Sequence, residues 1–150
     1  FHGGAEGSKH RHVTKKTEYY YGENRGNVYE FSHKLIDAGA DVIFGHGPHI
    51  TRAVEVYKDR FIAYSLGNFC TYARFNLRGS NGIAPIIKIK TDKEGRFLAG
   101  KIFPVIQTGE GGPKPDPENR AIKEIIELTN ADLNGGGLKI SDSGIIKPAE

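Results

Sequence analysis

Histidine stands beside glycine in two segments of this chain. His2 opens the sequence His-Gly-Gly-Ala-Glu, and His46 and His49 lie in the sequence Gly-His-Gly-Pro-His, directly after the apolar run Val-Ile-Phe. Neutral imidazole is a ligand for Zn, Fe, Mn and Ni, and glycine lets a ligand approach the backbone closely. We therefore expect these histidines to contact a metal ion or an anion. The alternative is that they are ordinary loop or core histidines whose ring nitrogens are already hydrogen-bonded.

A third candidate segment is Ser-Leu-Gly-Asn-Phe at residues 65–69. Asn68 can fix the turn with its side chain or offer its amide to a ligand. Three histidines and one glutamate do not complete a two-metal hydrolytic centre, which needs roughly six to eight protein donors. The chain has no Asp-x-His and no Asn-His pair. Either the remaining ligands lie in an N-terminal part that precedes this sequence, or there is no such centre.

Length and composition limit the classes of protein to which this chain can belong. The chain has 150 residues, of which 37% are hydrophobic and 26% charged, as expected for one globular domain with its own core. No apolar run approaches the ~20 residues that span a bilayer. The net charge of +3 is too small to indicate nucleic-acid binding. The chain contains no Met and opens without a signal peptide, so we expect a preceding part that would carry any targeting signal.

The single cysteine and one run of basic residues each allow two interpretations. Cys70 cannot form an internal disulfide, and its apolar neighbours favour a small buried hydrophobe over a reactive thiol. Residues 9–16 hold four cations and two histidines without an acidic residue. This run is either a solvated loop or a patch that faces a polyanion.

Apolar spacing predicts the elements that must position these side chains. A helix is expected over residues 24–38, with Asn24 as its N-cap. A second helix should begin with Asp116 as N-cap and Pro117 as its first residue, and present Ile122, Ile125, Ile126 and Thr129 to the core. The order indicates a mixed α/β domain. We also expect a long loop at residues 8–22 and strands at residues 41–44, 54–57, 61–65, 83–91, 96–107, 138–140 and 144–146.

A longer pattern runs through three stretches of the chain. These are Leu-Ile-Asp-Ala-Gly-Ala-Asp-Val-Ile-Phe-Gly-His-Gly-Pro-His at residues 35–49, Glu-Val-Tyr-Lys at residues 55–58 and Tyr-Ser-Leu-Gly-Asn-Phe at residues 64–69. The pattern resembles the CapA-type capsule synthesis family, which is associated with poly-γ-glutamate. Residues 2–6 are similar to the family's His-x-Gly-x-Glu segment, and residues 120–133 are similar to a helix near its C-terminal end.

The resemblance implies a calcineurin-like metallophosphatase fold, a two-sheet β-sandwich flanked by helices. Residues 1–150 would be a single-domain fragment, the C-terminal portion of that fold. The implied cofactor is a divalent metal ion, Mn, Fe, Zn or Mg. Carried over to this sequence, the metal ligands would be His2, His46, His49 and Glu6. The residues acting in catalysis would be His2, His46 and Asn68.

The function implied by the resemblance is poly-γ-glutamate capsule biosynthesis by a metal-dependent, phosphoesterase-like hydrolase. The implied location is the bacterial cell envelope or another extracytoplasmic place. The expected partners are an anionic polymer or phosphoester substrate and the missing N-terminal part of the same protein, with no nucleic acid. The alternative is a non-catalytic module that binds or exports the anionic polymer.

Overall fold

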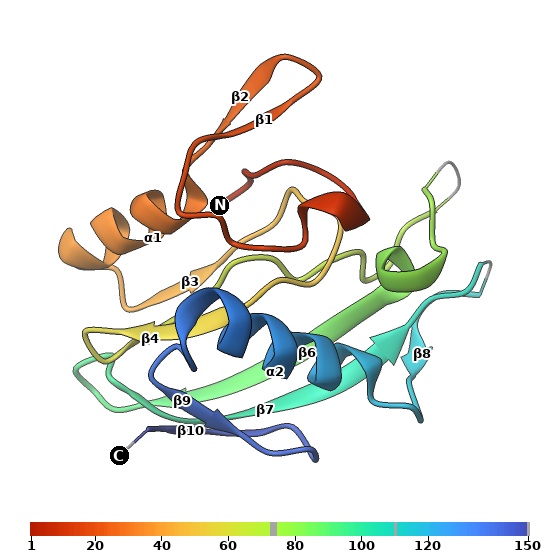
Figure 1. Cartoon of the computed structure of the whole chain (residues 1–150). Coiled ribbons are helices and arrows are strands. Elements are labelled where there is room, and N and C mark those ends of the chain that lie inside the picture. Colours follow the sequence, from red (N-terminus) through yellow and green to blue (C-terminus); the bar gives the residue numbers. More distant parts are fainter. Residues whose placement is uncertain (73–74, 110, 150) are drawn as a thin grey trace.

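The computed structural model describes residues 1–72, 75–109 and 111–149, which form two α-helices, two larger sheets and one small hairpin. Figure 1 shows the layers: helix α1 (Val28–Asp37) lies above a three-stranded sheet, which lies above a five-stranded sheet. Helix α2 (Arg120–Leu133) runs alongside both sheets. The predicted mixed α/β class and two-sheet arrangement are confirmed.

The three-stranded sheet carries the candidate histidine loop. Its strands lie in the order β3 (Val42–Phe44), β5 (Arg60–Ala63) and β4 (Val54–Tyr57). β3 and β5 are parallel, whereas β4 and β5 form an antiparallel hairpin. Lys58 and Asp59 turn that hairpin with φ of 48° and 62°, the left-handed pair that a two-residue loop requires. The strands predicted here are confirmed.

The five-stranded sheet forms the lower layer. Its long hairpin of β6 (Ile83–Thr91) and β7 (Phe97–Ile106) lies where the sequence predicted it. The order continues through β10 (Ile145–Pro148) to β9 (Leu138–Ile140), and the short strand β8 (Lys114–Pro115) pairs with β7. The main core fills the space between the two sheets and α2, with buried side chains from Val54, Phe61, Ala63, Phe97, Ile102, Ile122, Ile125, Leu138 and Ile146.

The first helix begins later than predicted. The side-chain oxygen of Asn27 accepts a hydrogen bond from the Glu30 N–H at 3.1 Å, so Asn27 is the N-cap. Asn24 belongs instead to strand β2 (Glu23–Gly26). The helical spacing of the apolar residues was a correct signal, but the residues before Asn27 are used in strand pairing. Buried residues of α1 pack on the opposite face of the three-stranded sheet.

The second helix also begins later, with Asn119 rather than Asp116 preceding it. Asp116 still satisfies the helix start, because its carboxylate accepts from the N–H groups of Glu118 at 3.1 Å and Arg120 at 2.9 Å. The helix ends at Leu133. Its buried side includes the predicted Ile122, Ile125 and Thr129, and Ile126 packs against the core partly buried.

Part of the predicted loop at residues 8–22 is regular structure. It contains the short 3-10 helix η1 (Ser8–His10) and strand β1 (Glu18–Tyr20), which pairs with β2. Tyr21 and Gly22 turn this hairpin with φ of 50° and 79°. A second 3-10 helix, η2 (Gly79–Gly82), precedes β6. Neither α-helix of the described residues has the length and apolar character needed to cross a membrane.

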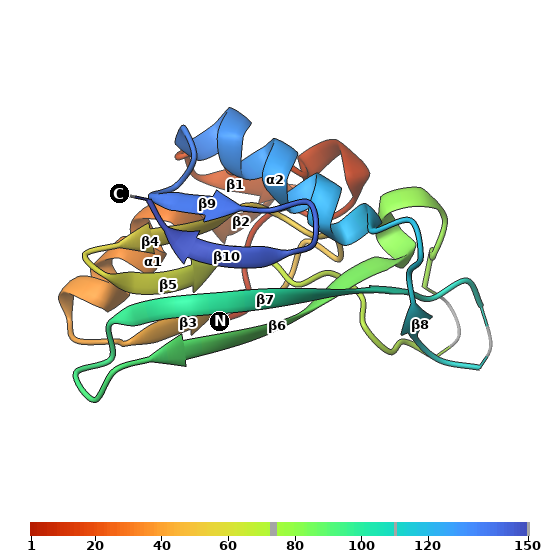
Figure 2. The ribbon, with the colours of Figure 1, turned by 90° about the horizontal axis from the view of Figure 1, so that it is seen from below.

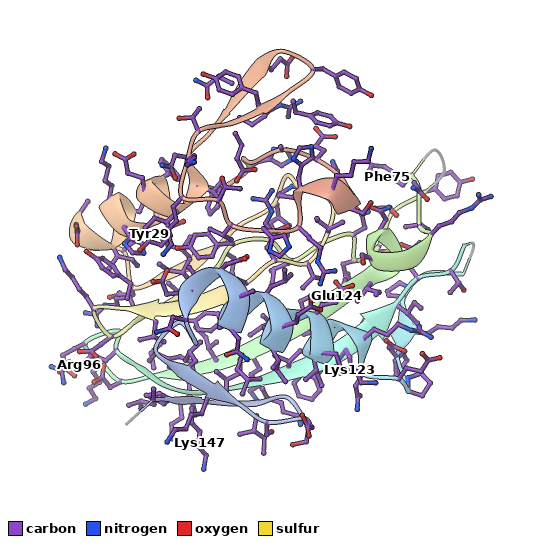
Figure 3. All side chains as sticks on the ribbon, viewed as in Figure 1. Tyr29, Phe75, Arg96, Lys123, Glu124 and Lys147 are labelled. Atoms are coloured by element: carbon purple, nitrogen blue, oxygen red, sulfur yellow. The ribbon has the colours of Figure 1, made fainter. Side chains whose placement is uncertain are left out.

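The prediction for the cysteine is wrong. Cys70 is exposed, because the chain turns to the surface after the buried Asn68. Its neighbours on that surface include Thr71, Tyr72 and Phe75. Figure 3 shows Phe75 extending from this segment at the end of the molecule.

Candidate functional site

The two histidine segments lie side by side because the first residues of the chain pair with the end of β3. His2 and His46 form a parallel bridge. The His46 N–H donates to the Phe1 carbonyl at 2.9 Å, and the Gly3 N–H donates to the His46 carbonyl at 2.8 Å. His46 follows the carboxyl end of a strand, which is where open α/β sheets present their ligand-binding loops.

Gly47 allows the two segments to approach this closely. It adopts φ of 123°, and a Cβ at this position would lie 2.5 Å from the Gly3 carbonyl oxygen. A side chain is therefore excluded by both conformation and contact. The next residue adds a further link, because the Pro48 carbonyl accepts from the Gly7 N–H at 2.9 Å.

His49 is held by Asn68. Its Nδ1 lies 2.9 Å from Asn68 Oδ1, and the Asn68 amide nitrogen donates to the carbonyls of His49 and Asn81, both at 3.0 Å. Because that nitrogen has two carbonyl partners, Oδ1 must be the atom facing the ring, and Nδ1 must carry the proton. Neutral His49 then has a free lone pair on Nε2. Its φ of 59° is a left-handed conformation that histidine adopts more readily than most residues.

Glu6 faces the free nitrogen of His49. The two atoms, Glu6 Oε2 and His49 Nε2, lie 3.8 Å apart. Both are acceptors when the ring is neutral, so their approach is favourable only when a proton or a cation stands between them. Glu6 Oε1 pairs with Arg25 Nη1 at 3.1 Å, and the ring of His2 lies 6.5 Å from that of His49 between centroids. His2, His49 and Glu6, three of the four predicted metal ligands, are therefore neighbours.

His46 lies at the same loop but its side chain is exposed. Partial desolvation lowers the pKa of His46, and nearby positive charge, including that of His2, adds to this effect. A lower pKa favours the neutral ring, the form that can ligate a metal. Asn68, in contrast, is buried, and its hydrogen bonds go to His49 and Asn81. Its place in the structure is that of a residue that orients His49.

The donor types suit a divalent cation, but they do not form a complete site. In the described ranges 1–72, 75–109 and 111–149, no group of three or more His, Cys, Asp or Glu side chains is arranged to hold a metal ion. The side chains of His2, His49 and Glu6 are neighbours, but they are not arranged around one point at which an ion could bind. These residues therefore fit a part of a metal centre.

Sequence reasoning missed the buried ion pair beneath this site. Arg52 is fully buried, and its Nη1 and Nη2 lie 3.0 Å and 2.8 Å from the Glu18 carboxylate oxygens. Arg52 also donates to the carbonyls of Ala5 and His10, while Glu18 accepts from the Ala5 N–H at 2.8 Å. The pair thus anchors the segment that carries Glu6. In the sequence, a single arginine before a strand does not indicate that it will be buried in an ion pair.

The basic run at residues 9–16 is partly neutralised. Arg11 pairs with Glu127 of α2 at 2.9 Å, and His12 lies 2.7 Å from Asp132 at the end of the same helix. Lys15 Nζ lies 4.9 Å from the centre of the Tyr29 ring. Several of its cations therefore fasten this segment to the domain.

Part of this site lies in a segment that matches a known protein family. Residues 18–73 match the family model described as bacterial capsule synthesis protein PGA_cap. That range includes the Gly-His-Gly-Pro-His loop, Arg52 and Asn68, but not His2 or Glu6.

Three relatives show strong similarity over short segments. The capsule biosynthesis protein CapA of Bacillus anthracis is 57% identical over 35 residues, 23% of this chain and 8% of that protein. The PGA biosynthesis protein CapA of Bacillus subtilis is 50% identical over 40 residues, 27% of this chain and 10% of that protein. An uncharacterised protein, y4sH of Sinorhizobium fredii, is 69% identical over 36 residues, 24% of this chain and 8% of its own length.

Proposed function

We propose that the chain, whose residues 18–73 match the model of the bacterial capsule synthesis family, acts in the biosynthesis of a poly-γ-glutamate capsule. The names of two relatives, capsule biosynthesis protein and PGA biosynthesis protein, support this reading. The place of action would be the bacterial cell envelope, where a capsule is assembled. Each match covers 8% to 10% of those relatives, so the activity of the whole protein is part of the proposal.

The finer proposal is that the histidine loop contributes to a metal-dependent, phosphoesterase-like hydrolytic site. The observation that carries it is the orientation of His49 by Asn68, which leaves Nε2 free and aimed at Glu6. His2 is the next imidazole, and His46 completes the set of donors on these two segments. The ion would be Mn, Fe, Zn or Mg, with the remaining ligands supplied from outside this chain.

A bound divalent ion would polarise a phosphoryl or acyl oxygen and lower the pKa of a bound water. The residues of this chain would hold and orient the reacting groups. Asn68 would fix the tautomer of His49, as partners of ligating histidines commonly do. Arg25, paired with both Glu6 and Glu23, would hold the Glu6 carboxylate in place beside the cluster.

A second candidate function is non-catalytic binding or export of the anionic polymer. It is favoured by one observation, the lack of a three-donor metal group within the described residues. In that case His49 and His2 would contact carboxylates of the polymer as hydrogen-bond donors or cations, and no hydrolysis would occur.

Metal content and hydrolysis of the full-length protein distinguish these functions. The protein is stripped with chelator, reloaded with Mn²⁺, dialysed and assayed with an aryl phosphate, alongside the variants His49→Ala and His12→Ala. His12 is a matched control because it is a paired surface histidine far along the chain from the loop.

The hydrolase proposal predicts stoichiometric metal and activity in the wild type and in His12→Ala, with both reduced in His49→Ala. The effect of removing a direct ligand should exceed the roughly 10–100-fold loss typical of an outer partner. Full-length protein that binds polymer but neither retains metal nor hydrolyses the ester would support the non-catalytic function instead.

A further inference from the structure

The five-stranded sheet is unusually basic. Strands β6, β7, β9 and β10 contain five lysines and no Asp or Glu. The net charge of the whole chain is only +3, so this sheet is more positive than the molecule that contains it. We call these five residues the lysine face: Lys88, Lys90, Lys101, Lys139 and Lys147.

The strand register brings the five lysines to one side of the sheet. Lys88 is directly opposite Lys101, and Lys147 is directly opposite Lys139. Side chains alternate along each strand, and the alternate positions point to the core. Those inward residues pack in the main hydrophobic cluster and include Ile87, Ile89, Ile102, Ile140 and Ile146. The lysines therefore point outward.

Neither helix of the described residues covers this side. Seen from below in Figure 2, strands β6, β7 and β10 face the viewer with no helix in front of them. In Figure 3, Lys147 extends away from the body of the molecule. Lys88, Lys90, Lys139 and Lys147 are exposed, and Lys101 is half-buried.

Three of the five charges of the lysine face have no ion-pair partner in the described part of the chain. No described carboxylate forms an ion pair with Lys88, Lys90 or Lys147. The Lys101 ammonium donates to the backbone carbonyl of Ser143. Like charges directly opposite each other on neighbouring strands destabilise a sheet, whereas Lys opposite Glu would stabilise it. The arrangement is therefore unfavourable for the isolated domain.

Protection of the sheet edge does not account for the whole face. Lysines on an edge strand prevent pairing with other chains, which explains Lys88 and Lys90 on β6. Lys101 lies on β7 and Lys147 on β10, however, and both strands have a neighbour on each side. Edge protection therefore does not explain Lys101 and Lys147, which lie on inner strands of the sheet.

We propose that the lysine face is a binding surface for a polycarboxylate chain, separate from the histidine loop. The identity of that chain as the capsule polymer poly-γ-glutamate rests on the proposed function. The inference that the ligand carries repeated anionic groups rests on the spacing of the lysines. Outward positions recur about every 7 Å along a strand and about every 5 Å between strands, so several carboxylates are contacted at once. Flexible ammonium groups suit a polymer that has no fixed register.

The lysine face is a better candidate than the basic run at residues 9–16. In that run Arg11 is paired with Glu127 and Lys15 lies against Tyr29. Those cations are already used within the domain. The lysine face keeps three charges without such partners in the described structure.

The test is binding of poly-γ-glutamate to the full-length protein, measured across a series of salt concentrations in the presence of chelator. The test variant is Lys88→Gln/Lys90→Gln/Lys101→Gln/Lys147→Gln. The control variant changes the net charge equally at exposed lysines elsewhere: Lys9→Gln/Lys16→Gln/Lys93→Gln/Lys123→Gln. Removing like charges should leave the test variant folded, with a melting temperature equal to or above that of the wild type.

We expect the test variant to lose at least about tenfold in affinity and to show a shallower salt dependence, and the control to lose less than about threefold. Equal losses in both variants, or tighter binding of duplex DNA than of poly-γ-glutamate at the same salt, would overturn the proposal. Because chelator is present, failure of the metal site leaves this result unaffected. Loss of polymer binding in His49→Ala with no loss in the test variant would place the polymer at the histidine loop instead.

Discussion

Arg52 and Glu18 form a buried ion pair in which each terminal guanidinium nitrogen, Nη1 and Nη2, meets one carboxylate oxygen, at 3.0 Å and 2.8 Å. The same pair holds the backbone of Ala5, next to Glu6 of the candidate site. A buried pair of this kind gives little net stability, but removing one partner leaves the other charge buried and unpaired. The link between the hairpin β1–β2 and the histidine loop therefore depends on both residues.

Glu18→Gln should lower the free energy of unfolding by about 3–5 kcal/mol, because Arg52 then remains charged and buried. Urea denaturation measures this directly. The matched control is Asp37→Asn, which breaks the exposed 2.6 Å pair with Lys58 and should have no measurable effect. A loss as small as that of the control would show that water reaches Arg52.

Gly47→Ala should be far more destabilising than Gly7→Ala. Both glycines have positive φ, of 123° and 91°, so both substitutions introduce conformational strain of about 1–2 kcal/mol. Only at residue 47 would the new Cβ also lie 2.5 Å from the Gly3 carbonyl oxygen, whereas the space beside Gly7 is open. Thermal unfolding of the two variants should therefore differ by several degrees. Equal melting temperatures would mean that the two segments do not pack as described.

The tautomer of His49 can be observed without any activity assay. We expect the Nδ1-protonated form, because Asn68 Oδ1 accepts from that nitrogen at 2.9 Å. Long-range ¹H–¹⁵N NMR of the ring nitrogens distinguishes the two tautomers. Asn68→Ala should release the ring and shift the signals toward the mixture seen in peptides, while Asn130→Ala, at an exposed position on α2, should not. A His49 ring protonated on Nε2 in the wild type would contradict the assignment.

Tyr64 makes the stability of the domain sensitive to high pH. Burial, with the adjacent Glu55 carboxylate, raises the pKa of Tyr64 well above its ordinary value, and its hydroxyl donates to Glu55 at 2.6 Å. The unfolded chain loses this proton near pH 10, while the folded state retains it. Stability is therefore fully present below about pH 10 and falls as the pH rises further, by up to about 1.4 kcal/mol per pH unit.

Tyr64→Phe should remove much of this slope between about pH 9.5 and pH 11, although it also lowers stability at neutral pH by removing the bond to Glu55. Tyr72→Phe, at a side chain that is 91% exposed, is the control. The free energy of unfolding at several pH values measures both. A slope that survives in Tyr64→Phe would assign the titration to another group.

Much of this architecture could be predicted from the sequence because local signals and tertiary packing agree. In strand β6, apolar and charged residues alternate from Ile87 to Lys90, and Ile87 and Ile89 are indeed the inward ones. Residues 45–49 form a loop, as predicted, because Pro48 restricts the backbone there and Gly47 can adopt its positive φ. The helix starts were misplaced by three residues each, since Asn24 and Asn27, or Asp116 and Asn119, are equally good caps by type alone.

Other features depend on long-range contacts that have no local signal. The pairing of Arg52 with Glu18 joins residues 34 positions apart, and the lysine face exists only once four strands are in register. Cys70 was expected to be buried because of its neighbours, but the chain turns to the surface after Asn68. The role of Asn68 itself was open in the sequence and is specified by its two carbonyl partners.

The central claim is that His49 presents Nε2 to a divalent cation. The most direct measurement is a crystal structure of the full-length protein with Mn²⁺, using anomalous scattering to locate the ion. We predict a peak within bonding distance of His49 Nε2, about 2.0–2.3 Å, with Glu6 or His2 as a further neighbour and Nδ1 still bonded to Asn68. Well-ordered crystals with no manganese at this loop, or with manganese bound elsewhere while His49 Nε2 contacts only protein, would contradict the account.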